Sequence, residues 1–202
     1  MTSAQLVLAS TSPYRRELLD RLGLPFVVAA PRVNETALAG ETPKQTALRL
    51  AQAKAKFIAD SFPNALVIGS DQVVELEGWA LGKPNNHENA VQQLRLMSGR
   101  TVAFHTGVCL INSSSGKIQS EVVPCSVTFR AITESEIENY LQREQPYNCA
   151  GSAKAEGLGI ALIQKMQSDD PNALIGLPLI ALIDMLKNEG VNVLQNPVGR
   201  KS

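Results

Sequence analysis

The chain has 202 residues, with 19 Lys and Arg against 19 Asp and Glu, so its formal net charge is zero. Hydrophobic residues make up 44% and charged residues 19%, a composition typical of a globular protein rather than a disordered one. At this length we expect one domain, whose core needs no disulfides. The charge balance argues against nucleic-acid polymers as partners, because such binding requires many basic residues to displace counterions.

The three cysteines, Cys109, Cys125 and Cys149, form no CxxC pair, so the sequence predicts neither a zinc site nor a disulfide framework. This usage suits the cytoplasm, where we expect the protein to be located. No apolar run approaches about 20 residues, so we expect no transmembrane helix and no membrane partner. Residues 1–4 lack the basic segment of a signal peptide.

Strands and helices alternate along the chain, which predicts an α/β fold. We expect, in order, a strand at 6–9, a helix from 13 to about 22, a strand at 26–30, a helix from 43 to about 61, and strands at 66–69 and 73–76. There follow a helix at 86–97, a hairpin of 101–111 and 118–132, a helix from the capping box at 133–136 to about 144, a strand at 159–163 and a helix at 178–188. The tail 196–202 is expected to fray.

The Ser-Thr-Ser-Pro turn at 10–13 follows the first strand and opens a helix. Ser12 suits the N-cap position and Pro13 the first helical position. A helix N-terminus offers N–H groups and a positive dipole end to an anion. Arg15 and Arg16 oppose that dipole, so they favour a bound phosphate, and the alternative is a capped surface helix with solvated arginines.

Lys54 falls in the middle of the apolar stripe of the helix expected at 43–61. The residues placed on the same face are Ala47, Leu50, Ala51, Phe57 and Ile58. A buried, unpaired ammonium is costly, so we expect Lys54 to meet a carboxylate or a bound anion in a cleft. The alternative is a lysine that extends past small alanines to solvent.

The strand expected at 66–69 runs into small and polar residues, and Asp71 is the acidic one among them. Ligands of open α/β sheets bind beyond the carboxyl ends of strands, where an aspartate can hold Mg²⁺ or activate water; the alternative is an aspartate that caps a turn.

Lys83 adds a cation in a rigid turn, or is an ordinary surface lysine. Glu35, in a polar loop, indicates little alone. The small residues of 149–159 permit close approach to a ligand, or form a flexible loop.

Taken together, these stretches resemble the Maf family of nucleotide pyrophosphatases. The resemblance is carried, in chain order, by 8–16, Glu35, Lys54 within 51–55, 69–73, 82–84 and 151–159. It implies a mixed elongated sheet flanked by helices, with two lobes around a central cleft as in ITPase-like proteins, in a single domain over 1–195. It also implies hydrolysis of nucleoside triphosphates to the monophosphate and pyrophosphate with a divalent cation, Mg²⁺ or Mn²⁺. Family members often form homodimers, and the family is tied to septum formation and division arrest.

The resemblance places Asp71 at the position of the catalytic proton acceptor. Our hypothesis for the rest of the site is that Lys54 and Lys83 neutralise charge on the leaving pyrophosphate. The proposed phosphate-binding residues are Ser10, Ser12, Arg15 and Arg16. Glu35 and Asp71 are the proposed metal ligands, and which carboxylate is the base stays open.

Three positions separate the substrate branches of the family, and here they are Tyr14, Gln72 and Glu156. The branch that cleaves dTTP and UTP usually shows Arg, Thr and Gln there, so this chain resembles the branch that acts on 7-methyl-GTP and keeps modified nucleotides out of nucleic acids. The methylated guanine is a cation, which an aromatic face and a carboxylate both attract. The alternatives are a dTTP/UTP pyrophosphatase and a nucleotide-binding regulator of septum formation without essential catalysis.

Overall fold

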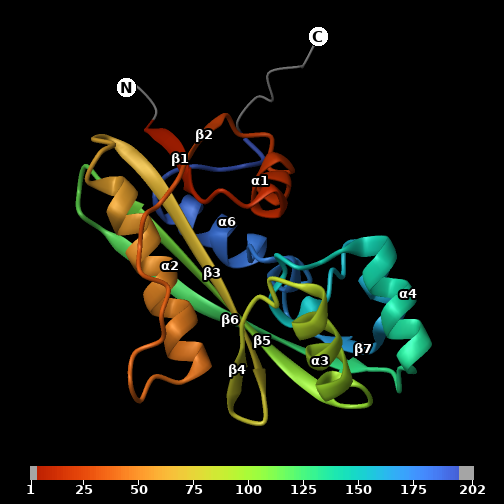
Figure 1. Ribbon diagram of the computed structural model, residues 1–202. Helices are drawn as coiled ribbons and strands as arrows, with labels where there is room; N and C mark the ends of the chain where they lie inside the picture. Colours follow the sequence, from red (N-terminus) through yellow and green to blue (C-terminus); the bar gives the residue numbers. More distant parts are fainter. Residues whose placement is uncertain (1–3, 196–202) are drawn as a thin grey trace.

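The fold is built on a mixed seven-stranded sheet with helices on both faces, in a computed structural model that describes residues 4–195 (Figure 1). The strands are β1 (Gln5–Ala9), β2 (Phe26–Ala29), β3 (Ala65–Leu76), β4 (Trp79–Leu81), β5 (Thr101–Asn112), β6 (Ile118–Phe129) and β7 (Ile163–Gln167). The helices are α1 (Pro13–Asp20), α2 (Pro43–Ala59), α3 (His87–Met97), α4 (Glu134–Glu144), α5 (Asn172–Ile175) and α6 (Leu179–Asn188), with 3₁₀ helices η1 (Ala150–Ser152) and η2 (Leu158–Leu162). The expected α/β class is confirmed, and the tail 196–202 lies outside the described residues.

The strand order is β2-β1-β3-β5-β6-β7, with β4 added at the edge of β3. β1 pairs in parallel with β2 and β3, and the remaining pairs are antiparallel. Along one edge of β3, β1 pairs with 65–69 and β4 with 74–76. Within the described residues no strand pairs with 70–73 on that edge, so the sheet has a gap there.

The expected break of the strand after Gly69 is wrong. Residues 70–72 continue to pair with β5, with Asp71 opposite Gly107, and β3 runs without interruption over 12 residues. The polar residues mark the point where the parallel neighbour β1 ends rather than the end of β3 itself. The rule that ligands bind beyond strand ends therefore applies here to β1.

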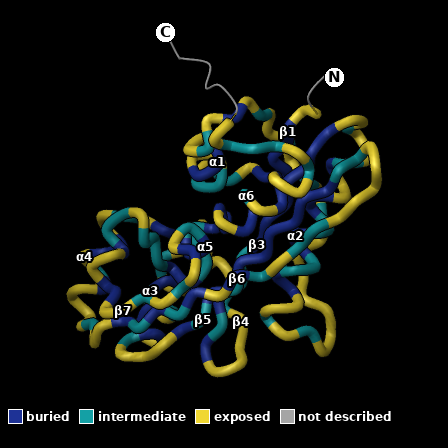
Figure 2. Tube along the Cα trace, turned by 180° about the vertical axis from the view of Figure 1, so that it is seen from behind, coloured by how far each residue is buried: buried dark blue, intermediate teal, exposed yellow. Residues whose placement is uncertain are grey.

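Two hydrophobic clusters lie on one face of the sheet and a third on the other. On the first face, α1 and α6 pack over β1, β3 and β5, while α3 and α4 pack over the far halves of β3, β5 and β6. On the opposite face, α2 packs over β1, β3 and β5. Figure 2 shows the buried residues concentrated along the central strands, with exposed residues in the hairpin ends and outer turns.

Helix α2 lies close to the sheet because two glycines face it. A Cβ on Gly69 would overlap the carbonyl oxygen of Ala51, and one on Gly107 would lie 2.5 Å from the carbonyl oxygen of Ala47. Alanines on the helix match the glycines on the strands, so backbone meets backbone. This seating fixes how deep the side chains of α2 reach into the sheet.

Several local predictions are confirmed by the helix ends. The Ser12 hydroxyl accepts a hydrogen bond from the Arg15 N–H, and Thr133 with Glu136 forms the expected capping box.

The three cysteines are free. None of the described helices is long and apolar enough to cross a membrane.

Several local predictions differ from the structure. Residues 158–162 form η2 rather than a strand, because the chain turns there and pairs with β6 only from Ile163. Phe57 is 43% exposed, since it lies at the edge of the apolar stripe of α2. The short elements β4 and α5 have no signal in the hydrophobic pattern. The ends of α1 and β6, at Asp20 and Phe129, fall two and three residues before the expected ends at 22 and 132.

Candidate active site

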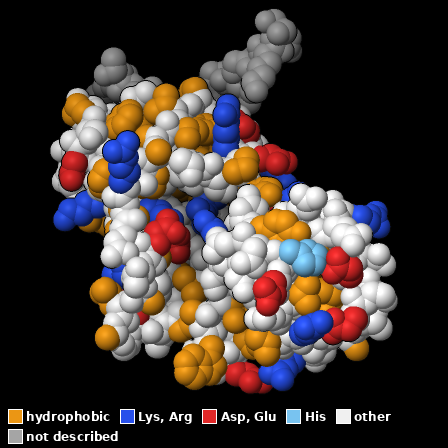
Figure 3. All heavy atoms as spheres, viewed as in Figure 1, with side chains coloured by type: hydrophobic (Ala, Val, Ile, Leu, Met, Phe, Trp, Pro, Cys, Tyr) orange, Lys and Arg blue, Asp and Glu red, His pale blue; other side chains and the backbone are white. Residues whose placement is uncertain are grey.

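A cavity of about 570 Å³ opens at the gap in the sheet beside 70–73. Its walls come from the turn after β1, the loop before α2, the turn after β4, and the segment before and after η1. The predicted site residues that line it are Ser10, Ser12, Tyr14, Arg15, Glu35, Lys54, Asp71, Gln72, Lys83 and Glu156. Figure 3 shows the cavity as a hollow across the middle of one face, with basic and acidic side chains at its mouth. The structure therefore brings these residues together from distant parts of the chain.

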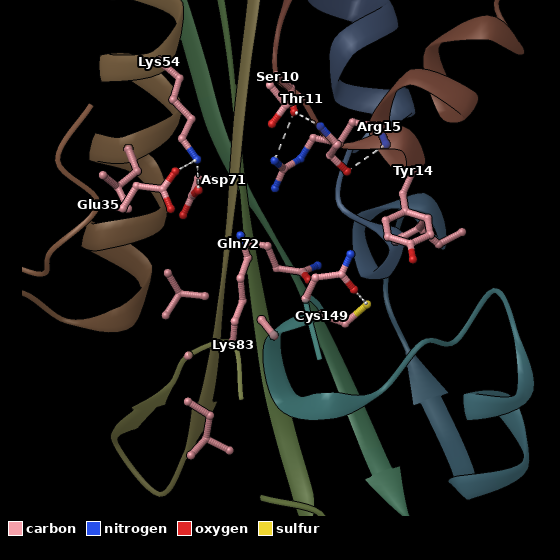
Figure 4. Close-up of a pocket in the computed structure, with 18 of the residues that line it drawn as sticks. Ser10, Thr11, Tyr14, Arg15, Glu35, Lys54, Asp71, Gln72, Lys83 and Cys149 are labelled. Atoms are coloured by element: carbon pink, nitrogen blue, oxygen red, sulfur yellow. Dashed lines mark hydrogen bonds and ion pairs between the residues drawn. The ribbon is translucent and has the colours of Figure 1, made fainter. Parts of the chain in front are cut away.

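Lys54 lies at the bottom of this cavity and forms ion pairs with two carboxylates. Its Nζ is 2.6 Å from Asp71 Oδ1 and 2.6 Å from Glu35 Oε1 (Figure 4). Lys54 and Asp71 are buried, whereas the Glu35 side chain is 53% exposed at the mouth. The expectation that Lys54 is buried and paired is confirmed, and the alternative in which it extends to solvent is wrong.

The charges around Glu35 keep it ionised. Partial burial acts to raise the pKa of Glu35, but the hydrogen bond and charge of Lys54 outweigh it, and Lys83 and Arg15 act in the same direction, so the pKa lies below its ordinary value. A carboxylate with a lowered pKa stays negative at neutral pH. The site thus presents a stable anionic oxygen beside a buried ammonium.

Arg15 points into the cavity from the first turn of α1 (Figure 4). Its Nε donates to the Gly176 carbonyl at 2.8 Å, and one terminal nitrogen lies 3.5 Å from the Ser10 hydroxyl. Burial lowers the pKa of Arg15, partly opposed by the charges of Asp71 and Glu35. No carboxylate of the described residues forms a direct ion pair with it, so the guanidinium is available to an anion in the cavity.

Two other predicted cations lie in different surroundings. Lys83 is exposed in the turn after β4 and lines the cavity, and among residues 4–195 no carboxylate pairs with it directly. Arg16 is exposed and is not among the lining residues. Helical geometry explains this difference, because neighbouring side chains on a helix point about 100° apart.

Gln72 points to the opposite face of the sheet from Asp71 and holds α5 in place. Its amide nitrogen donates to the Thr106 hydroxyl and to the carbonyls of Ala173 and Leu174 at 2.9 to 3.0 Å. The side chain is nevertheless part of the cavity wall. Its hydrogen bonds fix the position of the wall segment that includes Leu174.

Tyr14 lies across the cavity from Lys54 (Figure 4), and Glu156 is near enough to Tyr14 for its charge to act on the tyrosine. Loss of solvation raises the pKa of Tyr14, and the nearby Cys149 acts in the same direction. Loss of solvation also raises the pKa of Glu156. The charges of Glu144 and Glu17 add to this effect, and the charge of Lys154 opposes it. Both side chains line the cavity, so an aromatic ring and a carboxyl group are presented to its interior.

Comparison with known proteins fits this arrangement. The sequence profile described as "Maf-like protein" matches residues 5–189. The chain belongs to the Maf family. It is similar to the "7-methyl-GTP pyrophosphatase" of Methylobacillus flagellatus, with 61% identity over 94% of this chain and 98% of that one. The proteins of the same name from Nitrosococcus oceani and Thiobacillus denitrificans are 59% and 58% identical, over 94% and 97% of this chain and 95% and 98% of theirs.

Sequence reasoning missed part of this Maf cavity. The Gly176 carbonyl, which accepts from Arg15 and from the Ser70 hydroxyl at 2.8 Å, gave no signal, because it is a backbone group on the loop after α5. Cys149 also lines the cavity and interacts with Tyr14, and its sequence context predicts no such role. The small residues around Cys149 were the available signal, since they indicated close approach to a ligand.

Proposed function

We propose that this protein hydrolyses 7-methyl-GTP to 7-methyl-GMP and pyrophosphate, and so keeps the methylated nucleotide out of nucleic acids. The observation that carries the proposal is the cluster of Lys54 with two carboxylates in a cavity that also contains Arg15. A site that only binds phosphate needs cations, but it does not need a buried aspartate aimed at the same place. The names of the relatives, 7-methyl-GTP pyrophosphatases, support the choice of nucleotide.

In this proposal Arg15, Ser10, Ser12 and the N-terminus of α1 bind phosphate oxygens. Backbone N–H groups and the helix dipole favour an anion there, and the guanidinium adds a full charge. Arg15 rather than Arg16 is assigned this role, because Arg16 is exposed and is not among the residues that line the cavity.

Glu35 and Asp71 are the residues that would hold a divalent cation, Mg²⁺ or Mn²⁺. Both present carboxylate oxygens within 2.6 Å of one ammonium, so their oxygens already converge on a single positive charge. Residues 4–195 contain no cluster of three or more His, Cys, Asp or Glu suited to a metal. Two carboxylates suffice for Mg²⁺, which commonly completes its shell with water and substrate phosphates. When bound, the cation supplies positive charge to the phosphate oxygens.

The proton transfer is assigned to this chain's own carboxylate. As water attacks phosphorus and the P–O bond between the α- and β-phosphates breaks, Asp71 accepts the proton of the water. Lys54 orients Asp71 through their 2.6 Å contact. Lys54 and Lys83 then neutralise the charge that pyrophosphate carries away. Either carboxylate, Asp71 or Glu35, satisfies the chemistry of the base, and Asp71 is favoured because it is the more buried.

The base of the nucleotide is proposed to lie against Tyr14 and Glu156. N7-methylation makes guanine positive, and an aromatic face attracts a cation while a carboxylate attracts it and accepts hydrogen bonds. Gln72 contributes to specificity by fixing α5, through its bonds to the carbonyls of Ala173 and Leu174. An uncharged pyrimidine gains neither charge interaction.

The proposal extends to the whole molecule. We propose that 1–195 forms one domain whose two lobes meet at the cavity, with α1 and α2 on one side and β4, α3 and α4 on the other, and that the protein acts in the cytoplasm as a homodimer. Light scattering during size-exclusion chromatography measures the subunit number. A monomer at micromolar concentration would contradict the dimer.

The test of function is a pyrophosphate-release screen over 7-methyl-GTP, GTP, dTTP and UTP, each with Mg²⁺ and with Mn²⁺. We expect 7-methyl-GTP to give the highest kcat/KM and the products to be 7-methyl-GMP and pyrophosphate. A preference for dTTP or UTP would overturn the assignment. Saturable nucleotide binding with no hydrolysis would instead favour a regulator of septum formation or division arrest.

A further inference from the structure

One carboxylate outside the cavity holds the loop that carries Glu156. Glu144, the last residue of α4, contacts this loop on both sides of Glu156. Its Oε1 lies 2.5 Å from Lys154 Nζ, and its Oε2 accepts a hydrogen bond from the Leu158 N–H at 2.7 Å. Gly157 packs directly against the carboxylate, since a Cβ there would lie 2.7 Å from Oε2. The position of Glu156 is therefore set by Lys154 and Leu158, two residues before and after it, and by their common partner Glu144.

Lys154 is placed between Glu144 and the predicted base-binding wall. Its Nζ lies 5.8 Å from the centroid of the Tyr14 ring, within the range of a cation–π contact. The hydrogen bond from Lys154 to Glu144 raises the pKa of the lysine, so it stays charged. Neither Lys154 nor Glu144 is among the residues that line the cavity.

A fixed cation at this point matters for a positively charged base. An ammonium that is not neutralised would repel the methylated ring, and it would compete with that ring for the carboxylate of Glu156 and the face of Tyr14. Glu144 neutralises the ammonium of Lys154 and holds it 2.5 Å from its own carboxylate oxygen. The paired lysine can then support Tyr14 without taking the place of the substrate.

We propose that Glu144 is a positioning residue for recognition of the methylated base: by holding Lys154 and the Leu158 N–H, it leaves the carboxylate of Glu156 to the positively charged ring. This inference rests on the proposed function. It assigns specificity to a side chain outside the cavity, acting through Lys154 and the loop.

The test compares kcat/KM for 7-methyl-GTP and for GTP in the wild type, Glu144→Gln, Lys154→Met and the double variant. Glutamine keeps the acceptor for the Leu158 N–H and removes only the charge. We expect Glu144→Gln to lower the ratio of the two kcat/KM values about tenfold, chiefly through a higher KM for 7-methyl-GTP, because about 1.4 kcal/mol of new repulsion is tenfold. The double variant, which carries no free ammonium, should recover the ratio to within about threefold of the wild type.

The outcomes separate the inference from the function on which it rests. Glu138→Gln is the matched control, since Glu138 lies on the same helix and contacts His87 and Gln142 instead of the loop. Equal losses for both nucleotides in Glu144→Gln, or no recovery in the double variant, would reduce Glu144 to a structural residue and overturn the inference. A wild type that does not prefer 7-methyl-GTP to GTP would overturn the proposed function itself, before any variant is compared.

Discussion

Lys54 on α2 and Asp71 on β3 are 17 positions apart in the chain, and their charged groups meet at 2.6 Å at the bottom of the cavity. Both side chains are buried, and Glu35 completes the cluster from the mouth. An ion pair removed from water stabilises a protein only when both partners remain, because a single buried charge is strongly unfavourable. Variants of the two residues therefore allow the contribution of the pair to the free energy of unfolding and its contribution to turnover to be measured separately.

Asp71→Asn is expected to lower kcat for pyrophosphate release by about 10²- to 10⁴-fold, the usual contribution of a general base. The amide keeps the size of the carboxyl group, and Lys54 keeps Glu35 as a partner, so the variant should remain folded. Stopped assays of pyrophosphate with circular dichroism check both points. Asp60→Asn, an exposed residue at the end of α2, is the control. Near wild-type turnover in Asp71→Asn would remove the base from our mechanism.

Lys54→Met should lower the free energy of unfolding by about 3 kcal/mol, because it leaves the buried carboxylate of Asp71 without its counter-ion. Urea denaturation at pH 7 measures the change. Lys56→Met, an exposed position on the same helix, should stay within about 0.5 kcal/mol of the wild type. Combining Lys54→Met with Asp71→Asn should cost less than the sum of the single changes, and strict additivity would argue against the pairing.

Gly69→Ala is expected to destabilise the fold by about 1–3 kcal/mol or more, the cost of adding a methyl group to a packed core. The new Cβ would overlap the Ala51 carbonyl oxygen, a backbone atom that can move only with α2. Gly82→Ala is the control, since nothing lies within 4 Å of a Cβ there and its φ requires no glycine. Thermal melting compares the two variants, and an equal Tm would show that α2 does not rest on this glycine.

Glu41 and Arg49 fasten the loop that carries Glu35. Arg49 forms an ion pair with Glu41 and donates to the Thr36 carbonyl at 3.0 Å, and Glu41 accepts from the Leu38 N–H at 2.9 Å. The hydrogen bond from Arg49, followed by that from Leu38, lowers the pKa of Glu41 from 4.5 to about 2. A carboxyl group with a lowered pKa in the folded state stabilises the fold above its unfolded pKa and loses this effect as pH falls through the folded value.

The stability difference between wild type and Glu41→Gln should therefore be constant above about pH 5 and shrink as the pH falls from 4.5 towards 2. Chemical denaturation at a series of pH values in that window measures it. At neutral pH the same variant should also raise KM for the nucleotide, since Glu35 loses its fixed position. A stability difference that does not change between pH 5 and 2 would contradict the assigned pKa.

Residues whose placement follows local periodicity could be predicted from the sequence. Lys54 is the clearest case, because the helical repeat places it on the buried stripe and the cost of an unpaired charge demands a partner. The position of Arg15 near a helix N-terminus could likewise be predicted from the strand, turn and helix pattern around it. The same reasoning did not separate Arg15 from Arg16, because each direction depends on what the helix packs against.

Contacts between distant segments could not be predicted in this way. The Ser70 hydroxyl meets the Gly176 carbonyl 106 positions away, and Gln72 meets Ala173 101 positions away. The four-residue helix α5 is too short to show a period. The continuation of β3 through Asp71 was missed for a related reason, since polarity indicated an opening in the sheet but not which strand ended there.

The two glycines under α2 have a consequence for variation in this protein. Gly69 and Gly107 let the helix backbone rest on the strands, and the same approach brings the ammonium of Lys54 to Asp71. A larger residue at either position would lift the helix and lengthen that contact at once. A single substitution at either glycine would therefore change both the packing of α2 and the distance between the two charges. A stabilising substitution elsewhere in the chain could restore the Tm of such a variant, but it would not restore that distance.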